Sequence, residues 1–183
     1  DRRRSMNLPN KLTLARVIAV PFFIVLFLMG YNCWAAVLFI AAAATDALDG
    51  HLARKNGLVT NFGKIMDPLA DKILVISALI LLVQTGDVAG WMVIVILARE
   101  FTVAGLRTVA AADGTVIAAG MTGKIKTVLQ MIAVPLLLLE NWPFSYTGIP
   151  MDVIMLWACV IMTIISGVEY VYSNKKIFTK GGI

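Results

Sequence analysis

Apolar segments long enough to cross a lipid bilayer make up most of this 183-residue chain. A spanning helix needs about 20 predominantly apolar residues, because the hydrocarbon core is about 30 Å thick. Hydrophobic residues make up 60% of the sequence, whereas soluble domains typically contain about 45–50%. The sequence therefore predicts an all-α, polytopic membrane protein that forms one domain over residues 1–183. Six spans are expected, at 12–30, 33–53, 65–84, 89–110, 125–140 and 151–172.

The amino-terminal stretch predicts a helix that starts before the first span. Asn7 is a favourable N-cap, and Pro9 suits the first helical turn. We expect a short interfacial helix that bends at Pro21 into the first span. Met6 resembles a natural start, so residues 1–5 are interpreted as an addition to the natural protein. No cleavable signal peptide is predicted.

Basic residues lie in the two termini, in alternate connections between the spans, or inside spans near those ends. The connections "GYNCW", "QTGDVAG" and "ENWPFSYTGIP" contain neither Lys nor Arg. Cytoplasmic loops are enriched in these residues, so both termini and the loops at 54–64 and 111–124 are predicted to face the cytoplasm. Trp34, Trp91 and Trp142 are expected at the opposite interface. The prediction is a multi-pass protein of the cell membrane.

Four aspartates occur where the second and third spans approach the cytoplasmic edge. Asp46 and Asp49 lie on one stripe of the second span, and Asp67 and Asp71 on one face of the third. Consecutive spans joined by a short loop are antiparallel neighbours, so the two stripes are expected to face each other. A carboxylate inside a membrane costs about 3 kcal/mol, and intramembrane acids are therefore usually functional.

This arrangement predicts a binuclear metal site. Four carboxylates brought together repel one another unless they are protonated or neutralised by cations. Hard oxygen ligands suit Mg²⁺ or Mn²⁺, and two such ions stabilise the entering and leaving oxygens of a phosphoryl displacement. Gly50 and Gly63 would let a phosphate or nucleotide approach the helix backbone.

Ordinary structural roles stay open for individual charged residues. Asp67 before Pro68 is also typical of a helix start, although four aspartates on two helices favour the metal site. His51, the only histidine, lies off the carboxylate stripe and is interpreted as a bystander. Arg99 and Glu100 fit an internal ion pair as well as a contact with substrate.

The aspartates belong to a longer pattern with fixed spacing. Residues 46–71 contain Asp46-x2-Asp49-Gly50-x2-Ala53-Arg54-x8-Gly63-x3-Asp67-x3-Asp71. This pattern resembles the signature of the CDP-alcohol phosphotransferase family, and every fixed position is filled. Four further segments resemble the branch of the family that uses glycerol 3-phosphate: "NLPNKLTLAR" near the start, "AREF" at 98–101, "GLR" at 105–107 and "GKIKT" at 123–127.

The resemblance implies roles for particular residues. It implies that Asp46, Asp49 and Asp67 ligate two divalent ions, Mg²⁺ or Mn²⁺, and that Asp71 completes the second site and acts as general base. It implies that the cytidine diphosphate part of the donor is held by Asn10, Thr13, Asp49, Gly50, Arg54 and Gly63. It implies that Arg107, Lys124 and Lys126 bind the phosphate of sn-glycerol 3-phosphate. Lys124 and Lys126 diverge by about 200° on a regular helix, so we expect only one of them to point into the cavity.

The resemblance also implies a fold and a reaction. Members of the family have six transmembrane helices around a polar cavity open to the cytoplasm, and they usually form homodimers. The implied reaction transfers the phosphatidyl group from CDP-diacylglycerol to glycerol 3-phosphate in phospholipid biosynthesis, and CMP leaves. The expected partners are these substrates, membrane lipids and a second copy of the chain, and no nucleic acid is expected.

Three alternatives remain. The same chemistry is possible with inositol phosphate, serine or phosphatidylglycerol as the acceptor, although an acceptor without phosphate does not need Arg107 and its lysine partners. Intramembrane prenyltransferases also bind magnesium and pyrophosphate through Asp-rich helices, but they have more spans and lack the Asp-Gly-x2-Ala-Arg element. A divalent-cation transporter would need acids along a route through the bilayer, whereas the opposite halves of these spans carry almost no charge.

Overall fold

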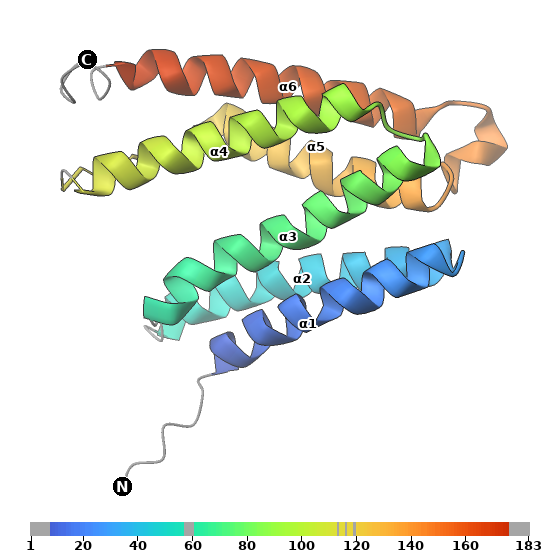
Figure 1. Cartoon of the computed structure of the whole chain (residues 1–183), viewed down its shortest axis with the longest axis horizontal. Helices are drawn as coiled ribbons and strands as arrows, with labels where there is room; N and C mark the ends of the chain where they lie inside the picture. The colour runs from blue at the N-terminus through green and yellow to red at the C-terminus, as the bar shows by residue number, and fades with distance from the viewer. Residues whose placement is uncertain (1–7, 57–60, 113, 116, 119, 176–183) are drawn as a thin grey trace, which may run out of the picture. The chain divides into compact units, whose positions relative to one another are not determined.

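The regular structure of this protein is helical. The computed structural model describes residues 8–56, 61–112, 114–115, 117–118 and 120–175, without the side chains of 8–13, 46–56 and 61–71. Every regular element in these described ranges is a helix, which confirms the all-α prediction (Figure 1). The chain forms two compact units, residues 1–85 and 86–183, and each is considered by itself.

The first unit consists of three long helices that alternate in direction (Figure 1). These are α1 (Leu8–Leu28), α2 (Asn32–Asn56) and α3 (Asn61–Thr85). Helix α1 packs extensively against both α2 and α3, while α2 and α3 contact each other much less among the described residues. Helix α1 is therefore the common packing partner within this unit.

Glycine ends helix α1 and allows the chain to reverse. Gly30 has a φ of 80°, in the left-handed region that residues with a Cβ seldom adopt. Its N–H donates to the carbonyl of Phe27 at 2.9 Å, and the N–H of Tyr31 donates to the carbonyl of Leu26 at 2.9 Å. These bonds satisfy carbonyl groups at the end of α1, so the next helix begins at Asn32 after a tight turn.

Large aromatic and small aliphatic side chains fill the core of the first unit. Phe23 of α1 is fully buried, and its ring centroid lies 6.4 Å from that of Phe27 and 6.3 Å from that of Phe39 on α2. Ala35 and Ala36 are also fully buried. Small side chains let helix backbones approach closely, which strengthens dispersion contacts between apolar helices.

The second unit is organised around α6. Its elements are α4 (Gly90–Ala112), α5 (Met121–Leu138), the short 3₁₀ helix η1 (Phe144–Thr147) and α6 (Met151–Ser173), and both α4 and α5 pack against α6. Asn141 fixes the connection into α6. Its Nδ2 donates to the carbonyl of Ile149 at 2.7 Å, and its Oδ1 accepts from the N–H of Asp152 at 3.2 Å.

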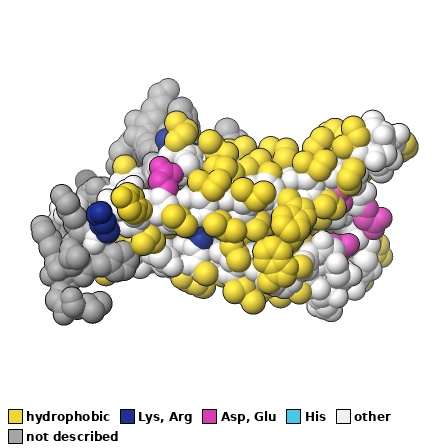
Figure 2. All heavy atoms as spheres, turned by 90° about the horizontal axis from the view of Figure 1, so that it is seen from above, with side chains coloured by type: hydrophobic (Ala, Val, Ile, Leu, Met, Phe, Trp, Pro, Cys, Tyr) yellow, Lys and Arg dark blue, Asp and Glu magenta, His cyan; other side chains and the backbone are white. Residues whose placement is uncertain are grey.

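The outer surfaces of the helices are apolar, as expected of a membrane protein. Figure 2 shows a face on which hydrophobic side chains predominate and charged side chains are few. Among the described residues, α5 and α6 are long and apolar enough to cross a membrane, and shorter apolar helical stretches cover 14–28, 32–45 and 72–85. Helix α1 runs continuously through Pro21. Neither six spans nor a separate interfacial helix is confirmed.

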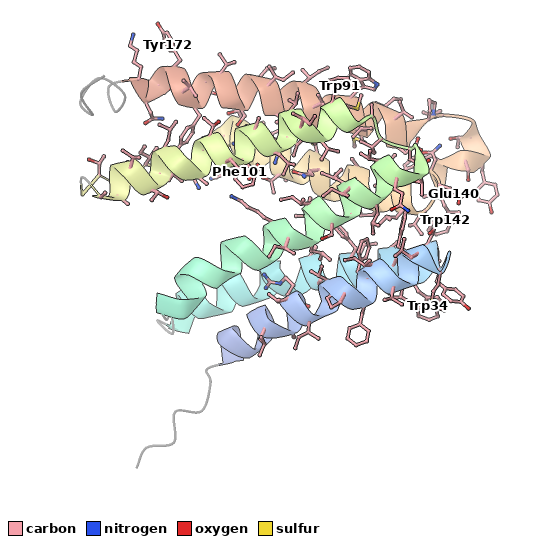
Figure 3. All side chains as sticks on the ribbon, viewed as in Figure 1. Trp34, Trp91, Phe101, Glu140, Trp142 and Tyr172 are labelled. Atoms are coloured by element: carbon pink, nitrogen blue, oxygen red, sulfur yellow. The ribbon has the colours of Figure 1, made fainter. Side chains whose placement is uncertain are left out.

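Aromatic residues lie at both ends of the second unit. Trp91 and Trp142 lie at one end and Tyr172 lies at the other (Figure 3). The ring of Trp91 packs against that of Trp157 with centroids 5.7 Å apart. Aromatic belts of membrane proteins have this distribution. The predicted orientation of the two ends relative to the cytoplasm stays a prediction.

The packing of α1 predicts different effects for two adjacent phenylalanines. Phe23 is 0% exposed and Phe22 is 63% exposed. Phe23→Ala should lower the free energy of unfolding by about 3 kcal/mol, because it leaves a cavity between α1 and α2. Phe22→Ala should change it by less than about 1 kcal/mol. Unfolding of the detergent-solubilised variants measures both values, and equal losses would contradict this description of the core.

Candidate active site

The four predicted metal ligands lie on helical backbone in the first unit. Asp46 and Asp49 belong to α2, and Asp67 and Asp71 belong to α3. Asp49 precedes the end of α2 by seven residues and Asp67 follows the start of α3 by six, or about 10 Å along each helix. The two positions therefore lie at similar distances from the ends of α2 and α3 that are consecutive in the chain. The side chains of these aspartates lie outside the described residues, so their convergence stays a prediction.

The predicted CDP-binding residues also lie on helices of the first unit. Asn10 and Thr13 belong to α1, Gly50 and Arg54 to α2, and Gly63 to α3. Helix α1 packs against both of the helices that carry the aspartates. These three helices therefore belong to one packed group. The contacts of these five residues lie outside the described part of the structure, and their roles stay predictions.

No group of three or more His, Cys, Asp or Glu side chains that could hold a metal ion occurs among the described residues. The side chains of the four aspartates of α2 and α3 lie outside those residues. The carboxylate set itself suits Mg²⁺ or Mn²⁺ through its hard oxygen donors.

Glu100 is the centre of a largely buried charged cluster in the second unit. Its Oε1 accepts a hydrogen bond from Lys126 Nζ at 2.5 Å and another from Arg99 Nη1 at 3.0 Å. The side chains of Lys126, Arg99 and Glu100 are 3%, 12% and 15% exposed. Among the described side chains, two cations against one carboxylate leave one excess positive charge. Burial at this level requires each charge to be paired.

Arg99 extends from α4 to α6 through space that two glycines provide. Arg99 Nη2 donates to the hydroxyl of Ser166 at 2.6 Å. A Cβ placed on Gly123 would lie 2.8 Å from Arg99 Nη2, and one on Gly167 would lie 3.3 Å from Arg99 Cγ. A side chain at either position would therefore crowd Arg99 in this conformation. Together with Lys126 of α5, the cluster connects all three long helices of the unit.

Arg107 makes a different kind of contact two turns further along α4. Its Nε donates to the hydroxyl of Tyr170 at 3.1 Å, and its guanidinium carbon lies 5.7 Å from the centroid of the Tyr170 ring. Arg107 is exposed, whereas Tyr170 is buried. No other hydrogen bond or ion pair of Arg107 occurs among the residues that the structure describes. Its two terminal nitrogens are therefore available to an anion.

The three predicted phosphate-binding residues have different surroundings. Lys124 is exposed and Lys126 is buried, as expected for residues about 200° apart on a helix. Lys126 contacts Glu100 and Arg107 contacts Tyr170. No contact joins Arg107, Lys124 and Lys126 directly in the described part of the chain. Binding of phosphate by these residues stays a prediction.

Arg99 and Glu100 form an ion pair, one of the two roles that the sequence leaves open for them. The sequence does not predict that Ser166 and Tyr170 are the partners of Arg99 and Arg107. Helical spacing points only weakly to these pairs: residues 166 and 170 share one face of α6, and residues 99 and 107 share one face of α4. Single hydroxyl groups in apolar helices are common, so this signal is weak.

Comparisons with known proteins agree on one family. A family model described as CDP-alcohol phosphatidyltransferase matches residues 6–165. A CDP-diacylglycerol–glycerol-3-phosphate 3-phosphatidyltransferase of Bacillus subtilis (strain 168) is 50% identical over 92% of this chain and 95% of its own length. Proteins with the same name from Rickettsia bellii and Wigglesworthia glossinidia brevipalpis are 40% and 36% identical over 94% and 91% of this chain, and over 97% and 94% of their own lengths.

The buried cluster predicts unequal effects for two lysines on α5. Lys126→Met should lower the free energy of unfolding by about 2 kcal/mol, because Glu100 loses a close buried partner. Lys124→Met, at an exposed position, should change it by no more than about 0.5 kcal/mol. Unfolding in detergent followed by circular dichroism measures both. A larger loss for Lys124→Met would contradict the assignment of Lys126 to the internal cluster.

Proposed function

The chain belongs to the CDP-alcohol phosphatidyltransferase family, and we propose that it transfers the phosphatidyl group from CDP-diacylglycerol to sn-glycerol 3-phosphate. The products are phosphatidylglycerophosphate and CMP, and the reaction belongs to phospholipid biosynthesis. The observation that carries this proposal is similarity over nearly the whole chain to transferases whose name states these substrates. The donor is a lipid, which suits the apolar helices of a membrane protein.

The four aspartates are proposed to hold two divalent cations, Mg²⁺ or Mn²⁺. Asp46, Asp49 and Asp67 would ligate both ions and Asp71 would complete the second site. The similar distances of Asp49 and Asp67 from consecutive helix ends in one packed unit support this assignment. When bound, the cations neutralise charge on the pyrophosphate of the donor.

The residues of the chain position the reactants and move one proton. Asn10, Thr13, Asp49, Gly50, Arg54 and Gly63 are proposed to hold the cytidine diphosphate part. Asp71 accepts the proton of the acceptor hydroxyl as its oxygen attacks the phosphorus that bears diacylglycerol. The bond from that phosphorus to the oxygen of CMP breaks, and CMP leaves with the electron pair. Correct placement of the two reactants supplies much of the rate enhancement in such transfers.

Positive charge in the second unit is proposed to select an acceptor that carries phosphate. Arg107 has two terminal nitrogens available, and Lys124 is exposed. Lys126 contributes through a cluster that retains one excess positive charge beside Glu100. A planar guanidinium and an ammonium are both common phosphate ligands. An acceptor without phosphate, such as serine, would not need these cations.

The remaining predictions concern topology and assembly. We propose six spans, both termini and the site on the cytoplasmic side of the cell membrane, and a homodimer surrounded by lipid. The alternation of basic connections supports the orientation. We propose that both units belong to one domain, because the family model covers residues 6–165 and crosses their boundary.

Release of CMP tests the reaction and its acceptor. Purified protein in detergent is given CDP-diacylglycerol and one acceptor at a time. Glycerol 3-phosphate should support turnover, EDTA should abolish it, and added Mg²⁺ or Mn²⁺ should restore it, because four carboxylates brought together repel one another and the donor pyrophosphate unless cations neutralise them. Turnover with serine or inositol phosphate alone would overturn the acceptor assignment. Turnover that survives EDTA would overturn the metal assignment.

Asp71→Asn tests the general base. The amide cannot accept the proton and is a weaker metal ligand, so kcat should fall by about 10³-fold or more. The matched control is Asp152→Asn, at the start of α6, where the side chain bonds to the N–H of Val153. This control should keep kcat within about 2-fold. Substantial turnover by a folded Asp71→Asn protein would remove Asp71 from the proposed chemistry.

A further inference from the structure

Two hydroxyl groups of α6 each accept a hydrogen bond from an arginine of α4. Ser166 accepts from Arg99 Nη2 at 2.6 Å, and Tyr170 accepts from Arg107 Nε at 3.1 Å. The hydroxyl residues are four apart and the arginines are eight apart, so each pair lies on one side of its helix. In both contacts a guanidinium nitrogen donates to a hydroxyl oxygen. The contacts differ in which nitrogen donates and in whether the terminal nitrogens have protein partners.

Arg99 has both terminal nitrogens occupied within the protein. Nη1 contacts Glu100 and Nη2 contacts Ser166, and the side chain is largely buried. Arg107 is exposed and uses only Nε, the nitrogen nearest its stem. The edge formed by its two terminal nitrogens therefore faces no partner among the described residues. Such an edge binds two phosphate oxygens through parallel hydrogen bonds.

Tyr170 is held firmly enough to fix the direction of Arg107. It is 7% exposed and packs in a buried cluster with Val103 and Leu106. The carbonyl of Tyr170 accepts hydrogen bonds from the backbone N–H of Asn174 at 3.2 Å and from Asn174 Nδ2 at 2.8 Å. The ring also lies 5.7 Å from the guanidinium carbon, within the range of a cation–π contact.

An exposed arginine otherwise loses considerable rotamer freedom when it binds a ligand. Tyr170 already holds Nε of Arg107 in the free protein, so less rotamer freedom is lost on binding. Because Nε is occupied, the arginine offers a ligand its two terminal nitrogens and not the edge that contains Nε. Pre-organisation of this kind strengthens binding without adding a contact to the ligand.

We propose that Tyr170 is a positioning residue for the acceptor: its hydroxyl holds Arg107 so that the terminal edge of the guanidinium receives the phosphate of the acceptor alcohol. This inference rests on the proposed function, in which Arg107 binds that phosphate. It assigns no contact between Tyr170 and substrate. Tyr170 acts only through Arg107, which a double-mutant cycle can test.

The first measurement is steady-state kinetics of Tyr170→Phe, which keeps the ring and removes the hydroxyl. KM for glycerol 3-phosphate should rise about 5- to 10-fold, the effect of one lost hydrogen bond. Because the loss affects binding and not the chemical step, kcat and KM for CDP-diacylglycerol should stay within about 2-fold. The matched control is Tyr172→Phe, at an exposed tyrosine of the same helix, which should leave all three values unchanged.

The second measurement tests Tyr170→Phe in proteins that lack Arg107. Arg107→Ala should raise KM for glycerol 3-phosphate, and Tyr170→Phe should add nothing in the Arg107→Ala background. In the Arg107→Lys background it should also add nothing, because lysine lacks Nε. A full additional effect in either background would overturn the proposal, since the hydroxyl would then act independently of Arg107.

Two further outcomes are informative. Equal falls in kcat for all substrates, with a lowered melting temperature of Tyr170→Phe, would assign Tyr170 a structural role and overturn the proposal. If that variant fails to fold, the Arg107→Lys protein tests the proposal. A KM for glycerol 3-phosphate like that of wild type would overturn it, because the Nε contact would then not matter.

Failure of the wild-type protein to use glycerol 3-phosphate would overturn the proposed function instead, and it would be seen before any variant is tested.

Discussion

A charged side chain inside an apolar helix bundle must find its counter-charge within the bundle, and the second unit depends on how Glu100 meets this requirement. One carboxylate oxygen accepts from both Arg99 and Lys126, and Ser166 occupies the other end of the arginine. Loss of any partner leaves a buried charge that water cannot easily reach. Because lipid is as apolar as the side chains it replaces, such polar contacts carry much of the association between α4, α5 and α6.

In the first unit, close packing of side chains holds the helices together. Phe23 and Phe39 interlock between α1 and α2, and fully buried alanines keep the backbones close. Helix α1 contacts both of its neighbours extensively, so it fixes the register of α2 relative to α3. That register is what the proposed metal site requires, because Asp49 and Asp67 are matched only while both helices remain in place. Helix α1 thus supports the proposed metal site through packing, in addition to carrying Asn10 and Thr13 of the proposed CDP site.

The sequence predicts the helices and the aspartate positions well, because apolar length and helical spacing are local properties. The helical setting of Asp46 and Asp71 follows directly from them. Lys126 shows where this reasoning ends. The family resemblance implies that Lys126 binds phosphate, and that role stays a prediction. Its contact with Glu100, 26 residues away, could not be predicted, because only tertiary packing brings the two residues together. Tyr170 was missed for the same reason, because nothing in a stretch of apolar helix distinguishes a tyrosine that meets an arginine from one that meets lipid.

The positive charges of the second unit fall into two groups with different capacities. Arg99 and Lys126 have already exchanged water for protein partners, so their positions are fixed. Arg107 and Lys124 are exposed and remain hydrated, so a phosphate can replace that water. In the proposed reaction, the buried group raises the local potential and the exposed group supplies hydrogen bonds to the phosphate of the acceptor. We therefore expect selection of a phosphorylated acceptor to require both groups, because potential alone attracts any anion and hydrogen-bond geometry alone attracts none from a distance.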